Sequence, residues 1–241
     1  MKKINVLMIG NSFSVDAANY THDISLGSNV VINVYVLYVG GCSLEQHINF
    51  IKNNEAPYEW FINGKSTGKY ISLKEALSYE EYDYITLQQV SVLSGRKDTF
   101  YPYIEELIHY VKQHQEDPHF VLHETWPYEN GFDNENFSFY KYDRKNMYKC
   151  IKDTYDDLAY ELNIDITIRS GDVIEAAIEY DGEHYHKDGF HLNNEGRYLA
   201  ALAFVHTFDK KPLKKVYVPN EDMFSDRLCK EYDDFVLEVL N

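Results

Sequence analysis

A serine near one end of the chain and an aspartate–histidine pair near the other end are residue types that nucleophilic catalysis needs. Ser12 lies just beyond the apolar run 4–9, and Asp188 precedes His191 by three positions. An imidazole can take the proton of a serine hydroxyl, and a carboxylate can orient that imidazole. Because Asp188 and His191 are close in sequence, one short loop can hold both. We predict a catalytic triad of Ser12, His191 and Asp188.

A structural role for the serine is the alternative. Ser12 and Ser14 both lie just before a segment with helical spacing, 16–26. A serine there commonly accepts a hydrogen bond from a backbone N–H of the first helical turn. We expect Ser14 to cap this helix, which leaves the Ser12 hydroxyl free to react.

Glycines and amides follow two further apolar runs, where an oxyanion could be bound. Backbone N–H groups of Gly40-Gly41-Cys42-Ser43 can converge on a developing oxyanion, although paired glycines are also typical of plain turns. A side chain of Gln88 or Gln89 can donate to the same oxyanion. The alternative for this pair is a hydrogen-bonded network that braces the strand end.

A third polar group follows the apolar run 120–122 and includes His123 and Trp126. Such side chains can stack on a sugar or a similar ring and hydrogen-bond to it. We take His123, Trp126 and Gln88 as candidate substrate-binding residues. A hydrogen-bonded structural histidine is the alternative for His123.

The elements that must position these residues follow from apolar periodicity. Continuous β-branched runs indicate strands that are buried on both faces, as in a parallel sheet covered by helices. We predict strands at 4–9, 30–39, 84–87, 120–122 and 164–168. We predict helices at 16–26, 43–53, 73–78, 101–114, 139–162, 193–208 and 222–240. The fold class is therefore α/β, a three-layer α/β/α sandwich around a central five-stranded parallel sheet. Ligands bind such sheets at the carboxyl ends of the strands.

Other local signals refine this picture. Asn63-Gly64 and Thr67-Gly68 indicate a small hairpin inserted near 57–72. Ser43 is an expected helix cap, and Asn193 or Asn194 is expected to cap the helix after the Asp188–His191 segment. The last helix has an apolar stripe that we expect to cover the core. No linker or repeat divides the chain, so we expect a single domain, 1–241.

Composition limits the partners. The 241 residues include 39 acidic and 23 basic ones, which gives a net charge of −16. This balance argues against nucleic acid and against an anionic membrane surface, and it favours a neutral small-molecule or carbohydrate ester. The apolar run after Met1 is too short for a signal peptide, so we expect a cytoplasmic protein. Three widely spaced cysteines and the His184-x-His186 pair do not suggest a metal site, and no cofactor is expected.

Taken in order, Gly10-Asn11-Ser12-Phe13-Ser14, Gly41, Gln88-Gln89 and Asp188-Gly189-Phe190-His191 resemble the sequence blocks of the SGNH, or GDSL-type, hydrolase superfamily. The pattern looks like that of a poorly characterised bacterial branch. The resemblance implies a flavodoxin-like fold with a Ser12 nucleophile, a His191 base and Asp188 as its orienting acid. It implies oxyanion donors at the Ser12 and Gly41 amides and at a side-chain amide, for which we favour Gln89 over Gln88. The superfamily usually has Asn in that last place, where this chain has Gln, and Asp where this chain has Asn11.

We therefore expect a serine esterase that cleaves a short-chain ester, with acetyl groups on carbohydrate as the first guess. An acyltransferase with the same nucleophile and a non-catalytic small-molecule or carbohydrate-binding domain are the alternatives. Nucleotide binding ranks lower, because the chain has no glycine-rich phosphate-binding motif.

Overall fold

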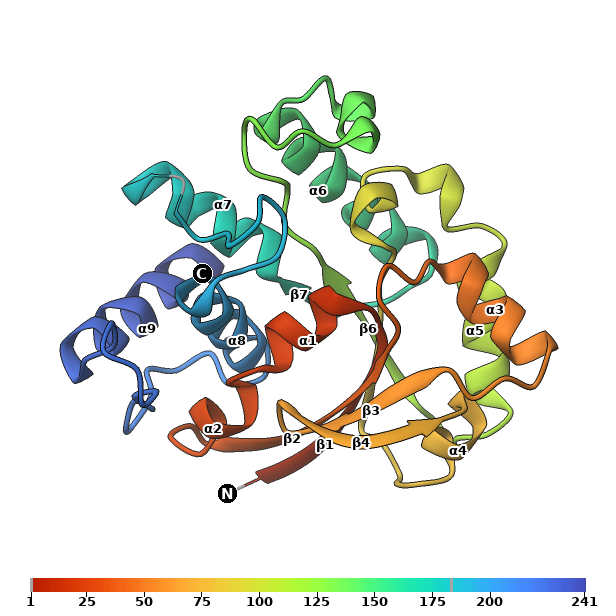
Figure 1. Ribbon diagram of the computed structural model, residues 1–241. Coiled ribbons are helices and arrows are strands. Elements are labelled where there is room, and N and C mark those ends of the chain that lie inside the picture. Colours follow the sequence, from red (N-terminus) through yellow and green to blue (C-terminus); the bar gives the residue numbers. More distant parts are fainter. Residues whose placement is uncertain (1, 183) are drawn as a thin grey trace.

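The computed structural model describes residues 2–182 and 184–241. Across these residues one sheet of seven strands runs through the molecule in the order β4-β3-β2-β1-β5-β6-β7 (Figure 1). Five adjacent strands are parallel and correspond to the five predicted apolar runs. They are β1 Lys2–Gly10, β2 Val30–Tyr38, β5 Tyr84–Leu87, β6 His119–Glu124 and β7 Thr167–Arg169. The predicted fold class is confirmed.

The predicted hairpin is part of this sheet. Its strands, β3 Tyr58–Ile62 and β4 Lys65–Ile71, are antiparallel, and β3 pairs with β2. The described residues therefore form a sheet of seven strands rather than five. The extra pair covers the β2 edge, which would otherwise present unpaired backbone groups.

Helices cover both faces of the sheet, with α1 and α8 on one side and α3 and α5 on the other (Figure 1). The helices of the described residues are α1 Ser12–Ala18, α2 Thr21–Ser25, α3 Leu44–Lys52, α4 Leu73–Leu77, α5 Tyr103–Lys112, α6 Arg144–Glu161, α7 Ser170–Asp181, α8 Asn194–Phe208 and α9 Asp226–Leu240. Short 3-10 turns lie at 91–93, 97–99 and 135–140. No helix of the described chain is long and apolar enough to cross a membrane.

The helices differ from the prediction most clearly in two places. The first predicted helix is two helices, and the first of them begins at Ser12 instead of Asp16. The helix α7 was not predicted, because its Ser-Gly start is typical of a turn and its first residue has no side-chain cap. Its buried residues Val173, Ile174, Ala177 and Ile178 do have helical spacing, which is the signal that identifies it.

Three caps fix where helices begin beside the sheet edge. Ser43 forms a capping box with Gln46 at the start of α3, and Asn193 accepts a hydrogen bond from the Gly196 N–H at the start of α8. Both caps were predicted. The cap of α1 was not: Asn11 accepts from the Phe13 N–H, so Ser14 does not cap this helix.

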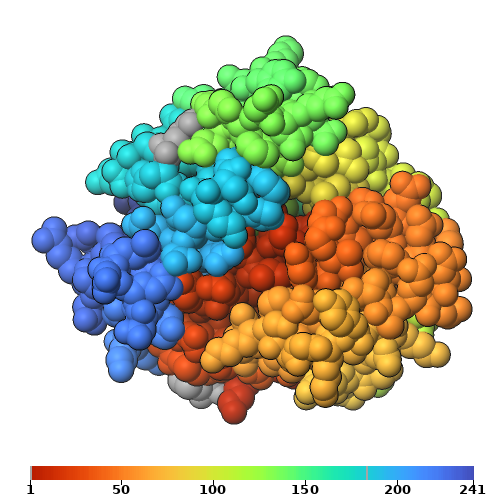
Figure 2. All heavy atoms as spheres, viewed as in Figure 1, coloured from red at the N-terminus to blue at the C-terminus, as the bar shows by residue number. Residues whose placement is uncertain are grey.

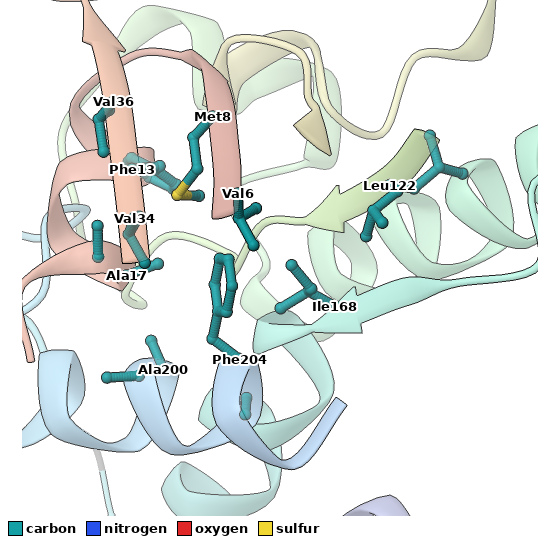
Figure 3. Packing of buried hydrophobic residues seen from close by; sticks show 14 of the residues in the cluster. Val6, Met8, Phe13, Ala17, Val34, Val36, Leu122, Ile168, Ala200 and Phe204 are labelled. Carbon is teal, nitrogen blue, oxygen red and sulfur yellow. The ribbon is translucent and has the colours of Figure 1, made fainter. Parts of the chain in front are cut away.

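The core extends over both faces of the sheet, and α8 contributes a large part of it. This helix is apolar on nearly all sides, as expected of a helix that is buried all round. Figure 3 shows Phe204 of α8 pointing toward Val6 and Ile168 of the sheet. On its outer side α8 packs against α9. The fully buried side chains of α9 include Cys229, Asp233 and Val236, and the partly buried Tyr232 and Phe235 pack beside them, so this helix covers the core as expected.

Candidate active site

Ser12 and His191 meet at the carboxyl end of the parallel strands although 179 positions separate them. The Ser12 Oγ lies 2.9 Å from His191 Nε2, and His191 Nδ1 lies 2.8 Å from Asp188 Oδ2. With a proton on Nδ1 donated to the carboxylate, Nε2 can accept the serine hydroxyl proton. These three predicted residues therefore form a hydrogen-bonded chain with the geometry of a nucleophile, a base and an orienting acid.

The Asp188 carboxylate also fixes the loop that carries His191. Its Oδ1 accepts hydrogen bonds from the backbone N–H of Phe190 at 3.3 Å and of His191 at 2.8 Å. Partial burial raises the pKa of Asp188, but the hydrogen bonds from His191 and from the backbone outweigh it and hold the pKa below its ordinary value. The acid is therefore ionised at neutral pH, as an orienting group must be.

Asp16 joins the nucleophile helix to the base loop, and the sequence analysis did not single it out. Its Oδ2 accepts from the Leu192 N–H at 3.0 Å, directly after His191. Its Oδ1 accepts from Arg197 of α8 at 2.8 Å. Asp16 stands four positions after Ser12, and residues spaced i, i+4 share a helix face. That spacing is the sequence signal that points to Asp16 once Ser12 is chosen.

The backbone N–H groups of Ser12 and Gly41 are the predicted oxyanion donors. The Ser12 amide lies in the first turn of α1, where N–H groups have no partner within the helix. The Gly41 loop is held in place by Asn11, whose Nδ2 donates to the Cys42 carbonyl at 3.1 Å. Gly41 itself is exposed.

The Gln89 side chain is hydrogen-bonded at both ends within the protein, which corrects its predicted role as an oxyanion donor. Its Nε2 donates to the Thr99 carbonyl at 3.0 Å. Its Oε1 accepts from the Leu44 N–H at 3.0 Å and from the Val90 N–H at 2.9 Å. The side chain is buried with both ends occupied. Gln89 therefore braces the loop that precedes α3, which is the network alternative.

Gln88 and His123 are also buried and do not face a substrate. The Gln88 Oε1 accepts from Ser14 Oγ and from His123 Nδ1, each at 2.7 Å, and its Nε2 donates to Asn11 Oδ1 at 2.9 Å. His123 Nε2 lies 3.1 Å from Ser170 Oγ. Burial lowers the pKa of His123 to about 3, so its imidazole is neutral. Both predicted substrate contacts are corrected: these residues tie four strand ends together beneath Ser12.

Gly10 makes this network possible. A Cβ at Gly10 would lie 2.1 Å from Ser14 Oγ and 3.0 Å from Gln88 Cδ. Any larger residue would displace the hydrogen bond between them. The glycine before the nucleophile is therefore required by close approach of side chains.

Trp126 is the third predicted substrate contact that the structure places in the interior. Its ring is fully buried and stacks on Phe13 with centroids 4.2 Å apart. Its Nε1 donates to the Phe190 carbonyl at 2.8 Å. Trp126 therefore supports the base loop from below and cannot contact a bound sugar.

The described part of the chain holds no cluster of three or more His, Cys, Asp or Glu side chains arranged for a metal ion. His186 lies 3.1 Å from the Pro127 carbonyl through Nε2. His186 therefore helps to join the base loop to the segment that follows β6.

The fold that holds this triad geometry is that of the SGNH and GDSL-type hydrolases. The structure is similar to a candidate SGNH hydrolase from Slackia heliotrinireducens, with a TM-score of 0.58, 22% identity, and coverage of 86% of this chain and 99% of the other. It is also similar to Axe2, an acetylxylan esterase from Geobacillus stearothermophilus, with a TM-score of 0.56, 11% identity, and coverage of 85% and 93%. At these identities the likeness shows a shared fold.

The chain belongs to the family described as a domain of unknown function, DUF4886, which matches residues 5–228. A crystal structure of a DUF4886 protein from Bacteroides uniformis is similar over 99% of this chain and 95% of that one, with 29% identity and a TM-score of 0.90. No curated protein matches the sequence. The family is thus a branch with the SGNH fold, in agreement with the resemblance noted above.

Proposed function

We propose that this protein is a serine esterase that hydrolyses short-chain esters through an acyl-enzyme. The observation that carries the proposal is the hydrogen-bonded chain from Ser12 through His191 to Asp188. Acyl transfer needs a nucleophile, a base and an acid in this order. A small-molecule-binding domain would not need these three groups aligned.

In the proposed reaction the Ser12 oxygen attacks the ester carbonyl carbon while His191 Nε2 takes the serine proton. The Ser12 and Gly41 amides stabilise the oxyanion. The bond to the alcohol oxygen then breaks, and His191 returns its proton to that oxygen. Water, activated by the same imidazole, releases the acid and regenerates Ser12.

Two features support a neutral substrate. The chain carries a net charge of −16, and the Asp188 side chain beside the base is 41% exposed. Both disfavour an anionic ester. Axe2, which shares the fold, is an acetylxylan esterase, so acetate esters of carbohydrates are a reasonable first panel.

Labelling with a fluorophosphonate tests the nucleophile. We expect the folded protein to be modified at Ser12, with fragmentation of the peptide showing that Ser14 is unmodified. Ser14 is the matched control, because it is buried and donates to Gln88. Ser12→Ala should lose both the label and the hydrolysis of acetate esters. Labelling that survives Ser12→Ala would reject the proposal.

Product analysis separates hydrolysis from transfer. Incubation with an acetate ester and an added alcohol acceptor should give free acetate as the main product. A new ester of the acceptor as the main product would instead make the protein an acyltransferase.

A further inference from the structure

A row of aromatic rings leads from the core beneath Ser12 to the molecular surface. Trp126 stacks on Phe13, the Phe13 and Phe190 centroids are 6.4 Å apart, and those of Phe190 and Phe132 are 5.3 Å apart with planes inclined by 27°. The first two rings are buried, whereas Phe190 and Phe132 are partly exposed. The outer end of the row is therefore an apolar surface formed by two nearly parallel rings.

Phe190 of this outer pair lies beside the base. The centroids of Phe190 and His191 are only 3.8 Å apart. Figure 2 shows the segment around residue 190 next to the N-terminal segment that carries the nucleophile. Phe132 is joined to these surroundings of the imidazole by its stacking on Phe190.

The backbone at Gly189 leaves room for the Phe132 ring. The Glu129 N–H donates to the Gly189 carbonyl at 2.8 Å, which joins the segment after β6 to the base loop. Gly189 has φ +90°, and a Cβ there would lie 2.4 Å from Phe132. Only glycine combines this backbone conformation with that contact.

The chemistry of the proposed reaction decides which part of an ester meets these rings. The proton that His191 Nε2 removes from Ser12 is returned to the alcohol oxygen as the bond between that oxygen and the acyl carbon breaks. The alcohol oxygen must then lie within hydrogen-bond distance of Nε2. Groups that surround the imidazole consequently border the alcohol and not the acyl group.

We propose that Phe132 and Phe190 form the alcohol subsite and select esters whose alcohol carries a ring with an apolar face, either an aryl group or a pyranose. This inference rests on the proposed function and adds its substrate class. Phe132 is the specificity-determining residue of the pair, since Phe190 also packs on the base. Flat rings stack on aromatic side chains with offset geometry, which open alkyl chains cannot reproduce.

The test compares benzyl acetate, an acetylated methyl pyranoside and ethyl acetate with wild-type protein and with Phe132→Ala. We expect Phe132→Ala to lower kcat/KM for at least one ring-bearing ester by roughly three- to tenfold, mainly through KM, and to leave ethyl acetate nearly unchanged. For each protein the kcat/KM of a ring-bearing ester is divided by that of ethyl acetate, and this ratio is compared between variants, so that the intrinsic reactivity of the esters cancels. A loss with benzyl acetate indicates a subsite for an aryl ring, and a loss with the acetylated pyranoside indicates a subsite for a sugar.

Two further variants control this test. Phe132→Leu keeps an apolar side chain without a flat face and should show the same loss. Phe139→Ala removes an exposed phenylalanine of the same segment and should change no ratio. Equal changes for ring and open-chain esters in Phe132→Ala would overturn the subsite while leaving the esterase in place. No turnover of any ester, with Ser12 unlabelled, would overturn both.

Discussion

The His191–Asp188 pair and the His206–Asp233 pair have the same nitrogen–oxygen distance, 2.8 Å, in very different surroundings. The first lies on a short loop at the sheet edge, with the imidazole 21% exposed. The second joins α8 to α9, and both of its side chains are completely buried. Distance alone therefore does not distinguish a catalytic pair from a structural one.

The difference lies in what the other imidazole nitrogen faces. In His191 that nitrogen faces the Ser12 hydroxyl, which has a proton to give. In His206 it faces the Asp209 carbonyl at 3.0 Å, which can only accept. Both nitrogens of His206 therefore face oxygen acceptors, and neither faces a hydroxyl group from which it could take a proton. A histidine–carboxylate pair is catalytic only when its free nitrogen remains an acceptor.

The largest expected effect comes from removing the exposed base. His191→Asn should lower kcat for an acetate ester by about 10⁴- to 10⁶-fold, because the serine hydroxyl loses its proton acceptor. The melting temperature should stay close to the wild-type value, since the side chain is at the surface. Hydrolysis rates and thermal unfolding of the same preparation check both statements. A variant with nearly full activity would remove His191 from the mechanism.

Breaking the buried pair should do the reverse. His206→Asn leaves the Asp233 charge in the interior without its main partner, so we expect the free energy of unfolding to fall by about 3–5 kcal/mol. Activity per folded molecule should be retained. Urea unfolding measures the loss, with His109→Asn on the exposed face of α5 as the matched control. A loss no larger than that of the control would contradict the structural role.

A substitution of Asp16 tests how far the position of the His191–Asp188 pair depends on this buried carboxylate. Asp16→Asn weakens the contacts to Leu192 and Arg197, so His191 is held less closely over Ser12. Misplacement of a catalytic group by about 1 Å can cost on the order of 10²-fold, and we expect a loss of that size in kcat with little change in KM. Asp98→Asn, whose side chain is 76% exposed, should behave as wild type. If KM alone changed, Asp16 would contact substrate instead.

The smallest effect is the pH dependence of the buried pair. Burial raises the pKa of Asp233, but hydrogen bonds from His206, the Leu213 N–H and Lys230 outweigh it and hold the pKa below its ordinary value. A carboxylate with a lowered folded-state pKa stabilises the fold above its unfolded pKa of about 3.9, and this stabilisation is lost as the pH falls through the folded value. The difference in unfolding free energy between wild type and Asp233→Asn should therefore shrink as the pH falls below about 4. A constant difference down to pH 2 would show that protonation of Asp233 does not change the free energy of unfolding.

The arrangement of the sheet was predictable because apolar runs such as 4–9 and 84–87 have no polar interruptions. The polar positions at strand ends, including Asn11, Gln88 and His123, were also identifiable, but their roles were not. Whether a side-chain amide points outward or inward depends on partners such as Thr99 and Ser170, which sequence alone does not place beside it. The proposed Ser12–His191 contact was predicted from residue chemistry and supported by the motif resemblance, because a separation of 179 positions does not by itself indicate proximity.

The loop around Phe132 shows the same limit. A phenylalanine within an acidic, glycine-containing stretch has no periodicity that predicts its contacts. Its place beside Phe190 depends on a backbone hydrogen bond between segments 60 residues apart, from Glu129 to Gly189. Aromatic residues that are prominent in the sequence, such as Trp126, are instead buried.

Ser12 is far along the chain from Leu192 and Arg197, the residues through which Asp16 holds the base loop. This separation has a consequence during synthesis. An emerging chain exposes the serine early, but the groups that would activate it follow 179 residues later and are anchored by α8. Until that helix docks, the hydroxyl is no more reactive than any other alcohol. Such a protein would stay inert on the ribosome and gain its reactivity only once the polypeptide has closed on itself.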